Sequence, residues 1–503
     1  MARLAWFTPL PPDRSGIATY SAEILPVLAS SHEIDVFLET ALEERRRPSA
    51  VGGAGERGAL DAPHRRDATA SAEARHGARP QRLLPAHDFV WRHTLRPYDL
   101  IVYHLGNATC HDYMWAYFPR YPGLVVLHDA QLHHARARQL LAAGRERDYE
   151  AELRFSHPSA PEGLAHLFRS GLGGTLYYFW PLLAVAVESA KVVAVHSPWL
   201  ALELARMFPR ARVEQVSMGT ADPDGDRHAE TASRAAALRR SLGIPEDTVV
   251  FAAFGRVTPE KRIPAALRAL REVRAYVPDA RLMLVGEPAG YYDVKSEAES
   301  LHVSEAVTVT GYVPDADLPF YVAASDVCLC LRWPSGRETS ASWLRCLAAG
   351  KPTIITELAH GASVPALDPR TWAPMFTADE SERGRSLSEP SPPLAVAIDI
   401  LDEDHSLGLA MRRLAADRAL RASLGNEARR YWERGHTLAR MAADYEKVIA
   451  SALDTETRRD RQLPAHLLAD GTRTAIETAA SVGVDLVFLG GTVPDVQANR
   501  HAG

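Results

Sequence analysis

Two cations stand close together in the segment FGRVTPEKRI, which runs from Phe254 to Ile263. Lys261 is one of five lysines in a chain of 503 residues, whereas the other 52 of its 57 basic residues are arginines. It follows the pair Gly255-Arg256, where an apolar run ends and a helix is expected to begin. The start of a helix favours an anion, arginine offers a fork for phosphate oxygens, and lysine offers a point charge. We therefore expect Arg256 and Lys261 to hold a pyrophosphate. The alternative is a solvated charge in the first turn of a helix.

A second polar segment, PSGRETSASWLRCLAAGKP from Pro334 to Pro352, follows another apolar run. Its glycine-containing loop leads into a helix that opens on Glu338, Thr339 and Ser340. The side chains and N–H groups of Thr339 and Ser340 are suited to a second set of phosphate oxygens. Glu338 could accept hydrogen bonds from sugar hydroxyls, and a carboxylate that only caps the helix is its alternative role.

In the first half of the chain, two strand ends carry candidate residues. Gly16 lies in TPLPPDRSGIATY, where a strand passes into a helix, and a plain turn glycine is its alternative role. His128 and Asp129 close the apolar run LVVLHD. A histidine at a strand end is usually structural, but the carboxyl ends of parallel strands form the ligand-binding edge of a sheet. We therefore expect His128 to face a ligand.

Four more polar side chains lie near this strand end. Asn107 and His111, in YHLGNATCHDYMW, could line a pocket for an acceptor, and structural roles are equally open to them. His133 and His134 fall in the helix expected after His128 and are weaker candidates.

The candidate residues must be positioned by runs rich in Val, Leu and Ile that alternate with helical patterns. Such runs are typical of parallel strands covered by helices on both faces. In the first half we expect a helix over Gly16–Leu28 and strands over Ala2–Phe7, His32–Leu38, Leu100–His104, Leu124–His128, Lys191–His196 and Arg212–Ser217. In the second half we expect strands over Thr248–Gly255, Arg281–Gly286, Ala306–Gly311, Asp326–Leu331 and Pro352–Thr356.

This pattern predicts an α/β fold with two doubly wound, Rossmann-like domains that face a cleft. Domains over residues 1–219 and 235–454, joined by a linker over 220–234, would place the carboxyl ends of both sheets at that cleft. Residues 45–82 contain Val51 and Leu60 as their only large aliphatic side chains, so we expect a disordered surface insertion there. For residues 455–503 we predict no fold.

The composition limits the partners and the compartment. A formal net charge of −6 gives no reason to expect nucleic acid. The opening MARLAWFTPLPPDRSG does not resemble a signal peptide, and the apolar run Tyr177–Val187 is too short to span a bilayer. We therefore expect a cytoplasmic protein, with peripheral membrane contact left open. No histidines accompany the cysteines at zinc-site spacing, so we expect free, buried thiols at Cys110, Cys328, Cys330 and Cys346.

Taken together, these segments resemble the retaining glycosyltransferases of the GT-B fold. They are most similar to glycosyltransferase family 4 and its bacterial relatives, the glycosyl transferases group 1. The resemblance covers about residues 2–454 without the insertion. It rests, in this order, on TPLPPDRSGIATYS, YHLGN, VVLHD, VHSPW, FGRVTPEK, LVGE, VTGYVP, LPFYVAASDVCLCLR and GRETSASWLRCLAAGKPTIIT.

The resemblance implies transfer of a sugar from a nucleotide-diphosphate-sugar donor, with retention at the anomeric carbon and without a required metal or other cofactor. Arg256 and Lys261 would hold the donor diphosphate, and the main chain around Val313 would meet the nucleobase. His128 would contact the donor sugar, and Gly16 would leave room for donor phosphate or acceptor. In this mechanism the leaving phosphate takes the proton of the acceptor hydroxyl.

The sequence departs from the family pattern in one place. The family has two glutamates eight positions apart before its AxxxG motif, and counting back from Gly350 these positions hold Arg337 and Arg345. Glu338 could take over the sugar-binding role after a one-residue shift in the loop. Because the usual ribose-binding carboxylate is absent, uridine, guanosine and thymidine donors all stay open.

Two other functions are compatible with the sequence. A non-catalytic GT-B protein that binds a nucleotide sugar or scaffolds a partner is favoured by Arg345. A sugar epimerase or phosphorylase on the same architecture has no closer motif match. The acceptor is open, whether a sugar, a glycan, a lipid-linked compound or a small molecule.

Overall fold

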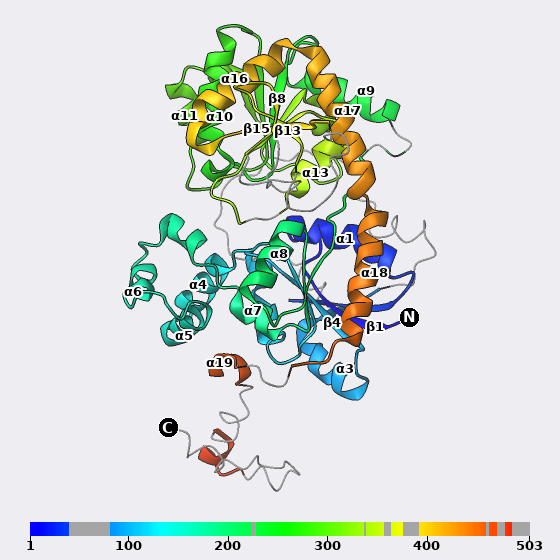
Figure 1. Ribbon diagram of the computed structural model, residues 1–503, viewed down its shortest axis with the longest axis vertical. Coiled ribbons are helices and arrows are strands. Elements are labelled where there is room, and N and C mark those ends of the chain that lie inside the picture. The colour runs from blue at the N-terminus through cyan, green and yellow to red at the C-terminus, as the bar shows by residue number, and fades with distance from the viewer. Residues whose placement is uncertain are drawn as a thin grey trace, which may run out of the picture.

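The computed structural model describes residues 1–39, 81–223, 225, 228–336, 339–356, 364–375, 392–458, 462–469 and 478–484. The chain forms two lobes, each built around its own sheet (Figure 1). The lower lobe holds the N-terminal strands, and the upper lobe holds the strands from β8 onward. The two-domain α/β architecture expected from the sequence is confirmed.

The lower lobe contains a seven-stranded parallel sheet with the order β3-β2-β1-β4-β5-β6-β7. Residues in β1, β4, β5 and β6 are buried along their whole length, as expected for strands covered on both faces. The strands are β1 (Arg3–Phe7), β2 (Glu33–Leu38), β3 (Arg82–Pro85), β4 (Leu100–Leu105), β5 (Leu124–Leu127), β6 (Val192–Val195) and β7 (Val213–Gln215).

The edge strand β3 corrects one sequence-based boundary. Arg82 was expected to end a disordered insertion, but it opens β3, and its Nε lies 2.7 Å from Asp35 Oδ1 on the neighbouring strand. Leu83 and Leu84 of this short RLLP segment are partly buried against the cores on the two faces of the sheet. Apart from residues 81 and 82, the expected insertion lies outside the described residues.

Helices cover both faces of the lower sheet and also form a small helical extension between β5 and β6. This extension has its own buried side chains, which include Leu140, Tyr149, Phe168 and Leu182. The helices and 3-10 helices of the lobe are α1 (Gly16–Leu28), η1 (Ala86–Asp88), α3 (Phe89–Leu95), η2 (Thr109–Ala116), α4 (His133–Ala142), α5 (Glu146–Ser156), α6 (Leu164–Arg169), η3 (Gly174–Phe179), α7 (Ala184–Ser189) and α8 (Pro198–Met207). The expected helix over Gly16–Leu28 is confirmed.

The upper lobe contains an eight-stranded sheet with the order β10-β9-β8-β11-β12-β15-β13-β14, parallel except for the β13–β14 pair. Its strands are β8 (Val250–Phe254), β9 (Arg281–Val285), β10 (Val307–Val309), β11 (Val327–Cys330), β12 (Thr353–Thr356), β13 (Ala366–Leu367), β14 (Pro374–Met375) and β15 (Ala395–Ile398). Its helices and 3-10 helices are α9 (His228–Ser241), η4 (Pro259–Lys261), α10 (Ile263–Arg274), α11 (Val294–Ser300), η5 (Ser304–Ala306), α12 (Leu318–Ala324), α13 (Ala341–Ala348), η6 (Ile400–Asp402), α16 (Glu403–Ala416) and α17 (Arg418–Gly435).

Two segments cross between the lobes side by side. Thr220 pairs with Thr437, and a Cβ on Gly219 would lie 2.4 Å from the Thr437 carbonyl oxygen, so only glycine fits this approach. The expected linker over 220–234 is too long, because α9 already begins at His228. The alanines and charged residues from His228 onward resemble a polar linker in sequence. In the structure they form α9, which packs on α12.

Helix α18 (Leu438–Asp454) returns the chain to the lower lobe (Figure 1). The sequence-based boundary placed this segment in the second domain. Its apolar face instead joins the core of the first sheet, where the Tyr445 hydroxyl lies 2.7 Å from that of Tyr20 and the Tyr445 ring packs on Trp6. The periodicity of an amphipathic helix does not say which sheet covers it.

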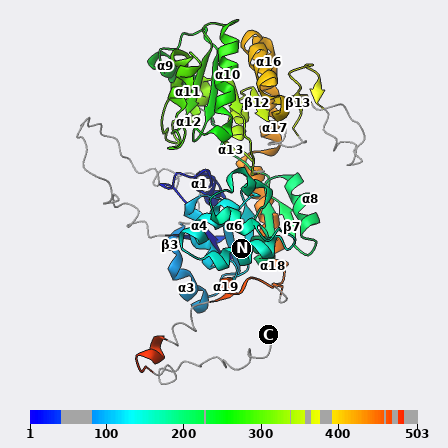
Figure 2. The same ribbon diagram turned by 90° about the vertical axis from the view of Figure 1, so that its left-hand side faces the viewer.

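Helix α19 (Ala465–Leu468) also docks on the lower lobe (Figures 1 and 2). Leu467 joins the core there, and His466 Nε2 lies 2.9 Å from Glu152 Oε1. Glu152 also forms a buried, two-pronged ion pair with Arg136, whose Nε lies 2.7 Å from Glu152 Oε2.

Replacing Glu152 with alanine should lower the free energy of unfolding by about 3–5 kcal/mol, because the Arg136 charge would stay buried without its partner. Urea unfolding followed by circular dichroism measures this loss. Glu146, on the same helix but exposed, is the matched control, and Glu146→Ala should change stability by about 0.5 kcal/mol or less. Equal effects of the two changes would contradict the structural role of the pair.

Within the described ranges, no helix is long and apolar enough to cross a membrane. All four cysteines are free thiols, as expected. Cys328 and Cys346 are buried, whereas Cys110 and Cys330 are partly exposed, so the expectation of burial is confirmed for two of them.

Candidate functional site

The loop after β8 brings Lys261 against the strand end. Lys261 lies on the 3-10 turn η4, two residues before α10, and its Nζ donates a hydrogen bond to the Phe254 carbonyl oxygen. Gly255 has φ +86°, and a Cβ at this position would lie 2.6 Å from Lys261 Nζ. The positive φ favours glycine at this turn, and a larger residue would push the ammonium group of Lys261 away from its present position.

Arg256 follows this glycine and is exposed. It lies within electrostatic reach of Tyr291: burial raises the pKa of the Tyr291 hydroxyl, Glu260 adds to the rise, and Arg256 opposes it. The Tyr291 hydroxyl is 3.3 Å from Glu260 Oε2. The structure thus gathers two cations, one carboxylate and one phenol around the carboxyl end of β8.

The second polar segment leads into α13. The Ser340 hydroxyl accepts a hydrogen bond from the Trp343 N–H at 3.2 Å and so caps this helix. The N-terminal end of α13 then offers backbone N–H groups, and Thr339 precedes it. Val313 lies between β10 and α12, partly buried against the core. Glu338 lies outside the described residues.

The two lobes meet at the loops that follow β5, β8 and β11. The Ala130 N–H of the lower lobe donates to the Gly336 carbonyl oxygen of the upper lobe at 2.8 Å. Within the upper lobe, the Trp333 N–H donates to the Glu260 carbonyl oxygen, also at 2.8 Å. The strand ends of both sheets are therefore adjacent, as the sequence predicts.

Gly16 lies at the other side of this junction, at the start of α1. It is exposed, and a Cβ on it would meet no atom within 4 Å. Next to it, Arg14 stacks over the ring of Tyr312 in the upper lobe at 4.2 Å and lies 3.7 Å from Glu287 Oε2. The loop that carries Gly16 is thus in contact with the upper lobe through Arg14.

His128 is buried in a row of three histidines at the ends of β4, β5 and β6. Its Nε2 lies 2.9 Å from His104 Nδ1, and its Nδ1 lies 3.3 Å from His196 Nε2. His196 Nδ1 lies 3.0 Å from the Val216 carbonyl oxygen, which can only accept, so this nitrogen carries a proton. His196 Nε2 then accepts from His128 Nδ1, and His128 Nε2 accepts from His104 Nδ1.

This row has two consequences for the ring of His128. Both of its nitrogens are engaged, so a hydrogen bond to a sugar would have to replace one of them, and the sugar contact stays a prediction. Burial lowers the pKa of His128 and of His104 well below 6.5, and it lowers the pKa of His196 to about 4. The row is therefore neutral at pH 7.

The comparisons with known proteins agree with this geometry. Residues 235–364 match the family described as glycosyl transferases group 1. Among solved structures, Anabaena HepE in complex with UDP has a TM-score of 0.54 at 14% identity, covering 90% of this chain and 100% of that one. WaaG, a glycosyltransferase involved in lipopolysaccharide biosynthesis, has a TM-score of 0.52 at 14% identity, covering 89% and 99%. This is the GT-B glycosyltransferase fold.

Two curated glycosyltransferases are similar over shorter ranges. A GDP-mannose-dependent phosphatidylinositol monomannoside mannosyltransferase of Mycolicibacterium smegmatis is 29% identical over 38% of this chain. An α-monoglucosyldiacylglycerol synthase of Streptococcus pneumoniae is 30% identical over 25% of it. The aligned parts span 52% and 27% of these relatives, respectively.

Several residues singled out in the sequence have structural roles in this GT-B protein. The Asn107 side chain donates to the Gln131 carbonyl oxygen and accepts from the Ala135 N–H at 3.3 Å. His111 Nδ1 lies 2.8 Å from the His104 carbonyl oxygen, and His133 Nε2 lies 2.7 Å from the Tyr149 hydroxyl.

His134 differs from Asn107, His111 and His133. It faces the junction between the lobes. Its ring packs on Tyr177 at 4.6 Å, and the Glu260 carboxylate of the upper lobe lies within electrostatic reach of it. His134 is thus the member of this group for which an electrostatic effect of the upper lobe is found.

Arg345, the departure from the family pattern, pairs across the lobes. Its guanidinium lies 3.2 Å from Glu23 Oε1 on α1, and both side chains are about one-fifth exposed. Sequence reasoning missed Glu23, because an α1 glutamate on an otherwise apolar helix carries no motif. The pair ties α13 of the upper lobe to α1 of the lower lobe.

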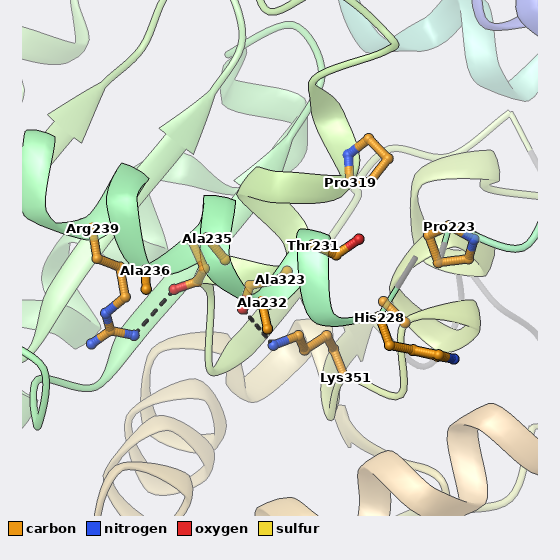
Figure 3. Close-up of a pocket in the computed structure, with 12 residues that line it drawn as sticks. Pro223, His228, Thr231, Ala232, Ala235, Ala236, Arg239, Pro319, Ala323 and Lys351 are labelled. Carbon is orange, nitrogen blue, oxygen red and sulfur yellow. Dashed lines mark hydrogen bonds between the residues drawn. The ribbon is translucent and has the colours of Figure 1, made fainter. Parts of the chain in front are cut away.

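A cavity of about 440 Å³ lies elsewhere on the upper lobe, between α9 and α12 (Figure 3). Its two cations are both committed to the end of α12. Lys351 Nζ donates to the carbonyl oxygens of Ala323 and Ser325 at 2.8 and 2.7 Å, and Arg239 donates to that of Ala324 at 3.1 Å. Because cations stabilise a helix C-terminus, we interpret this cavity as a packing feature.

Proposed function

We propose that this protein is a retaining glycosyltransferase that transfers a sugar from a nucleotide-diphosphate-sugar donor to an acceptor hydroxyl. The observation that carries this proposal is the close approach of Lys261 to Gly255, with Arg256 exposed beside it. Arg256 and Lys261 follow the carboxyl end of the central strand β8, and open α/β sheets bind ligands at such strand ends.

The chemistry requires that negative charge on the leaving nucleotide diphosphate be stabilised as the glycosidic bond breaks. Fixed donors aimed at that charge supply most of the effect. Lys261 would contribute a point charge, Arg256 a fork, and the N-terminus of α13 its backbone N–H groups. The leaving phosphate oxygen then takes the proton of the acceptor hydroxyl, on the same face of the sugar.

Among the described residues of the site, no side chain selects one nucleobase for the proposed donor. HepE was solved with UDP and with UDP-glucose, and the mycobacterial relative is named for GDP-mannose. We therefore include uridine, guanosine and thymidine donors in the test. The names of both curated relatives refer to lipid acceptors, which makes a lipid-linked acceptor a reasonable first choice.

The test is a thermal shift screen with UDP, GDP and dTDP, followed by an assay for sugar transfer. A ligand that binds only the folded state at 100 times its Kd should stabilise the protein by about 2.7 kcal/mol. NMR of the product should show the anomeric configuration of the donor. A diphosphate that binds without any transfer to a broad acceptor panel would favour the non-catalytic alternative.

Removal of divalent metal should leave the activity unchanged, because Arg256 and Lys261 would neutralise the diphosphate. The measurement is turnover before and after dialysis against EDTA, with an added excess of Mg²⁺ or Mn²⁺ as the comparison. A large, metal-reversible loss would show that these two cations are insufficient.

A further inference from the structure

A cavity of about 310 Å³ lies where the lobes meet. The upper lobe contributes Ser335 and Gly336, which directly precede the α13 loop. The lower lobe contributes residues after β5, after α5, on and after η3, and on α8. The lining consists of Ala130, Gln131, His157, Tyr178, Phe179, Pro181, Leu183, Leu200, Glu203, Leu204, Met207, Ser335 and Gly336.

Two polar side chains of the cavity lining already form hydrogen bonds within the protein. Gln131 donates from Nε2 to the Tyr177 carbonyl oxygen and accepts at Oε1 from the His133 N–H at 3.0 Å. His157 Nε2 donates to the Pro181 carbonyl oxygen at 2.7 Å. Leucines from α8 and the segment before α7 form the buried side of the lining. Tyr178, Glu203 and Ser335 also line the cavity, so it combines an apolar wall of leucines with a few polar groups.

The apolar side chains at the rim of this cavity are unusually exposed to solvent. Phe179 and Met207 line the cavity and are 70% and 49% exposed. Leu176 precedes Phe179 by three positions on a 3-10 helix, so both lie on one face, and Leu176 is also exposed. Apolar side chains gathered at the mouth of a cavity mark a binding surface.

We propose that this cavity binds a hydrocarbon chain of the acceptor, so that the acceptor is a molecule with an apolar tail and a hydroxyl-bearing head. The position of the cavity selects this occupant. Gly336 is three residues from Thr339, and Ala130 is two residues from His128, so a tail in the cavity places its head at the proposed transfer site. The proposal rests on the proposed function and specifies its substrate class.

The first experiment needs no donor. The full-length protein is irradiated with an octyl glucoside that carries a diazirine in its alkyl chain, below its micelle concentration. Labelled peptides should contain residues 172–183 and 198–207, and unlabelled octyl glucoside should compete whereas methyl glucoside should not. Labelling confined to other peptides would overturn the proposal, even if donor turnover were demonstrated.

Variants at the rim sharpen this experiment, because exposed positions tolerate substitution. Met207→Glu should reduce the labelling at least tenfold. Leu202→Glu is the matched control, since Leu202 lies on the same helix with 47% exposure but does not line the cavity. Equal losses in both variants would indicate a nonspecific apolar surface and overturn the proposal.

Kinetics with donor separate the two proposals. For a series of alkyl acceptors, KM should fall about fourfold for each added methylene until the cavity is filled, with kcat unchanged. Met207→Glu should abolish this dependence without changing the affinity for nucleotide diphosphate. If sedimentation shows instead that Met207→Glu only dissociates a dimer, a second copy is the occupant and the proposal is wrong. Absence of any donor turnover would count against the proposed function and leave the labelling result standing.

Discussion

Replacing Lys261 with alanine should lower kcat by about 100- to 1000-fold, because loss of one fixed donor to developing charge costs about 2.7–4 kcal/mol of transition-state stabilisation. Arg256→Ala should have an effect of the same order. The Lys261 ammonium is held against Gly255 and the Phe254 carbonyl oxygen, so it needs no reorganisation to meet a diphosphate. The measurement is release of nucleotide diphosphate from the best donor, beside the affinity for that diphosphate.

Two comparisons make this result interpretable. The stability of Lys261→Ala should fall by only about 1 kcal/mol, the contribution of one hydrogen bond. Lys295, an exposed lysine on α11, is the matched control, and Lys295→Ala should leave turnover unchanged. Lys261→Arg should not restore activity, because a planar fork does not fit the close contact at Gly255. Parent-like turnover in both alanine variants would show that Lys261 is a surface charge.

Acidification should destabilise the lower lobe strongly between about pH 6.5 and pH 4. Burial lowers the pKa of His196 and of His111 to about 4, from about 6.5 in the unfolded chain. Between these values the unfolded state binds more protons than the folded state, so stability falls as the pH falls. A shift of this size corresponds to about 3 kcal/mol for each histidine once the pH reaches 4.

Among the described residues, two tyrosines pack on this row of histidines, and neither supplies a negative charge in this pH range. Tyr20 lies against His104, His128 and His196, and burial raises the pKa of its own hydroxyl. Tyr445 lies against His104, and its hydroxyl pairs with that of Tyr20. A proton that enters the row would therefore remain an unpaired charge in a dry site, which is why the folded state resists it.

Urea unfolding at a series of pH values measures this loss. His196→Gln should reduce the loss between pH 7 and pH 5 by about 2 kcal/mol, because one titrating group is removed. His87 is exposed, and His87→Gln should leave the curve unchanged. Where His196→Gln does not fold, NMR of the imidazole nitrogens in the parent gives the same answer. Titration of the rings of His111 and His196 near pH 6.5 would contradict the prediction.

The amino-acid sequence by itself determined the presence of two sheets and the positions of most of their strands along the chain. Runs such as LVVL and VFAAF are apolar along their whole length, and short apolar runs separated by helical patterns favour parallel strands without reference to the rest of the chain. The same local logic located Gly255, Arg256 and Lys261, because a strand end, a glycine and two cations lie within eight residues of one another.

Only the tertiary structure decided where separated segments meet. Helix α18 has the same amphipathic pattern whichever lobe it covers, and Tyr20 and Trp6 determine that it packs on the first. The sequence placed His128 at a strand end, but the neighbours of that end are set by the order of β4, β5 and β6 in the sheet. Because of this order, one ring nitrogen of His128 lies next to His104 and the other next to His196. Arg345 likewise finds Glu23 on the other lobe. Hydrogen bonds and ion pairs act over a few ångströms, and residues tens to hundreds of positions apart come within that range only after the sheets have formed.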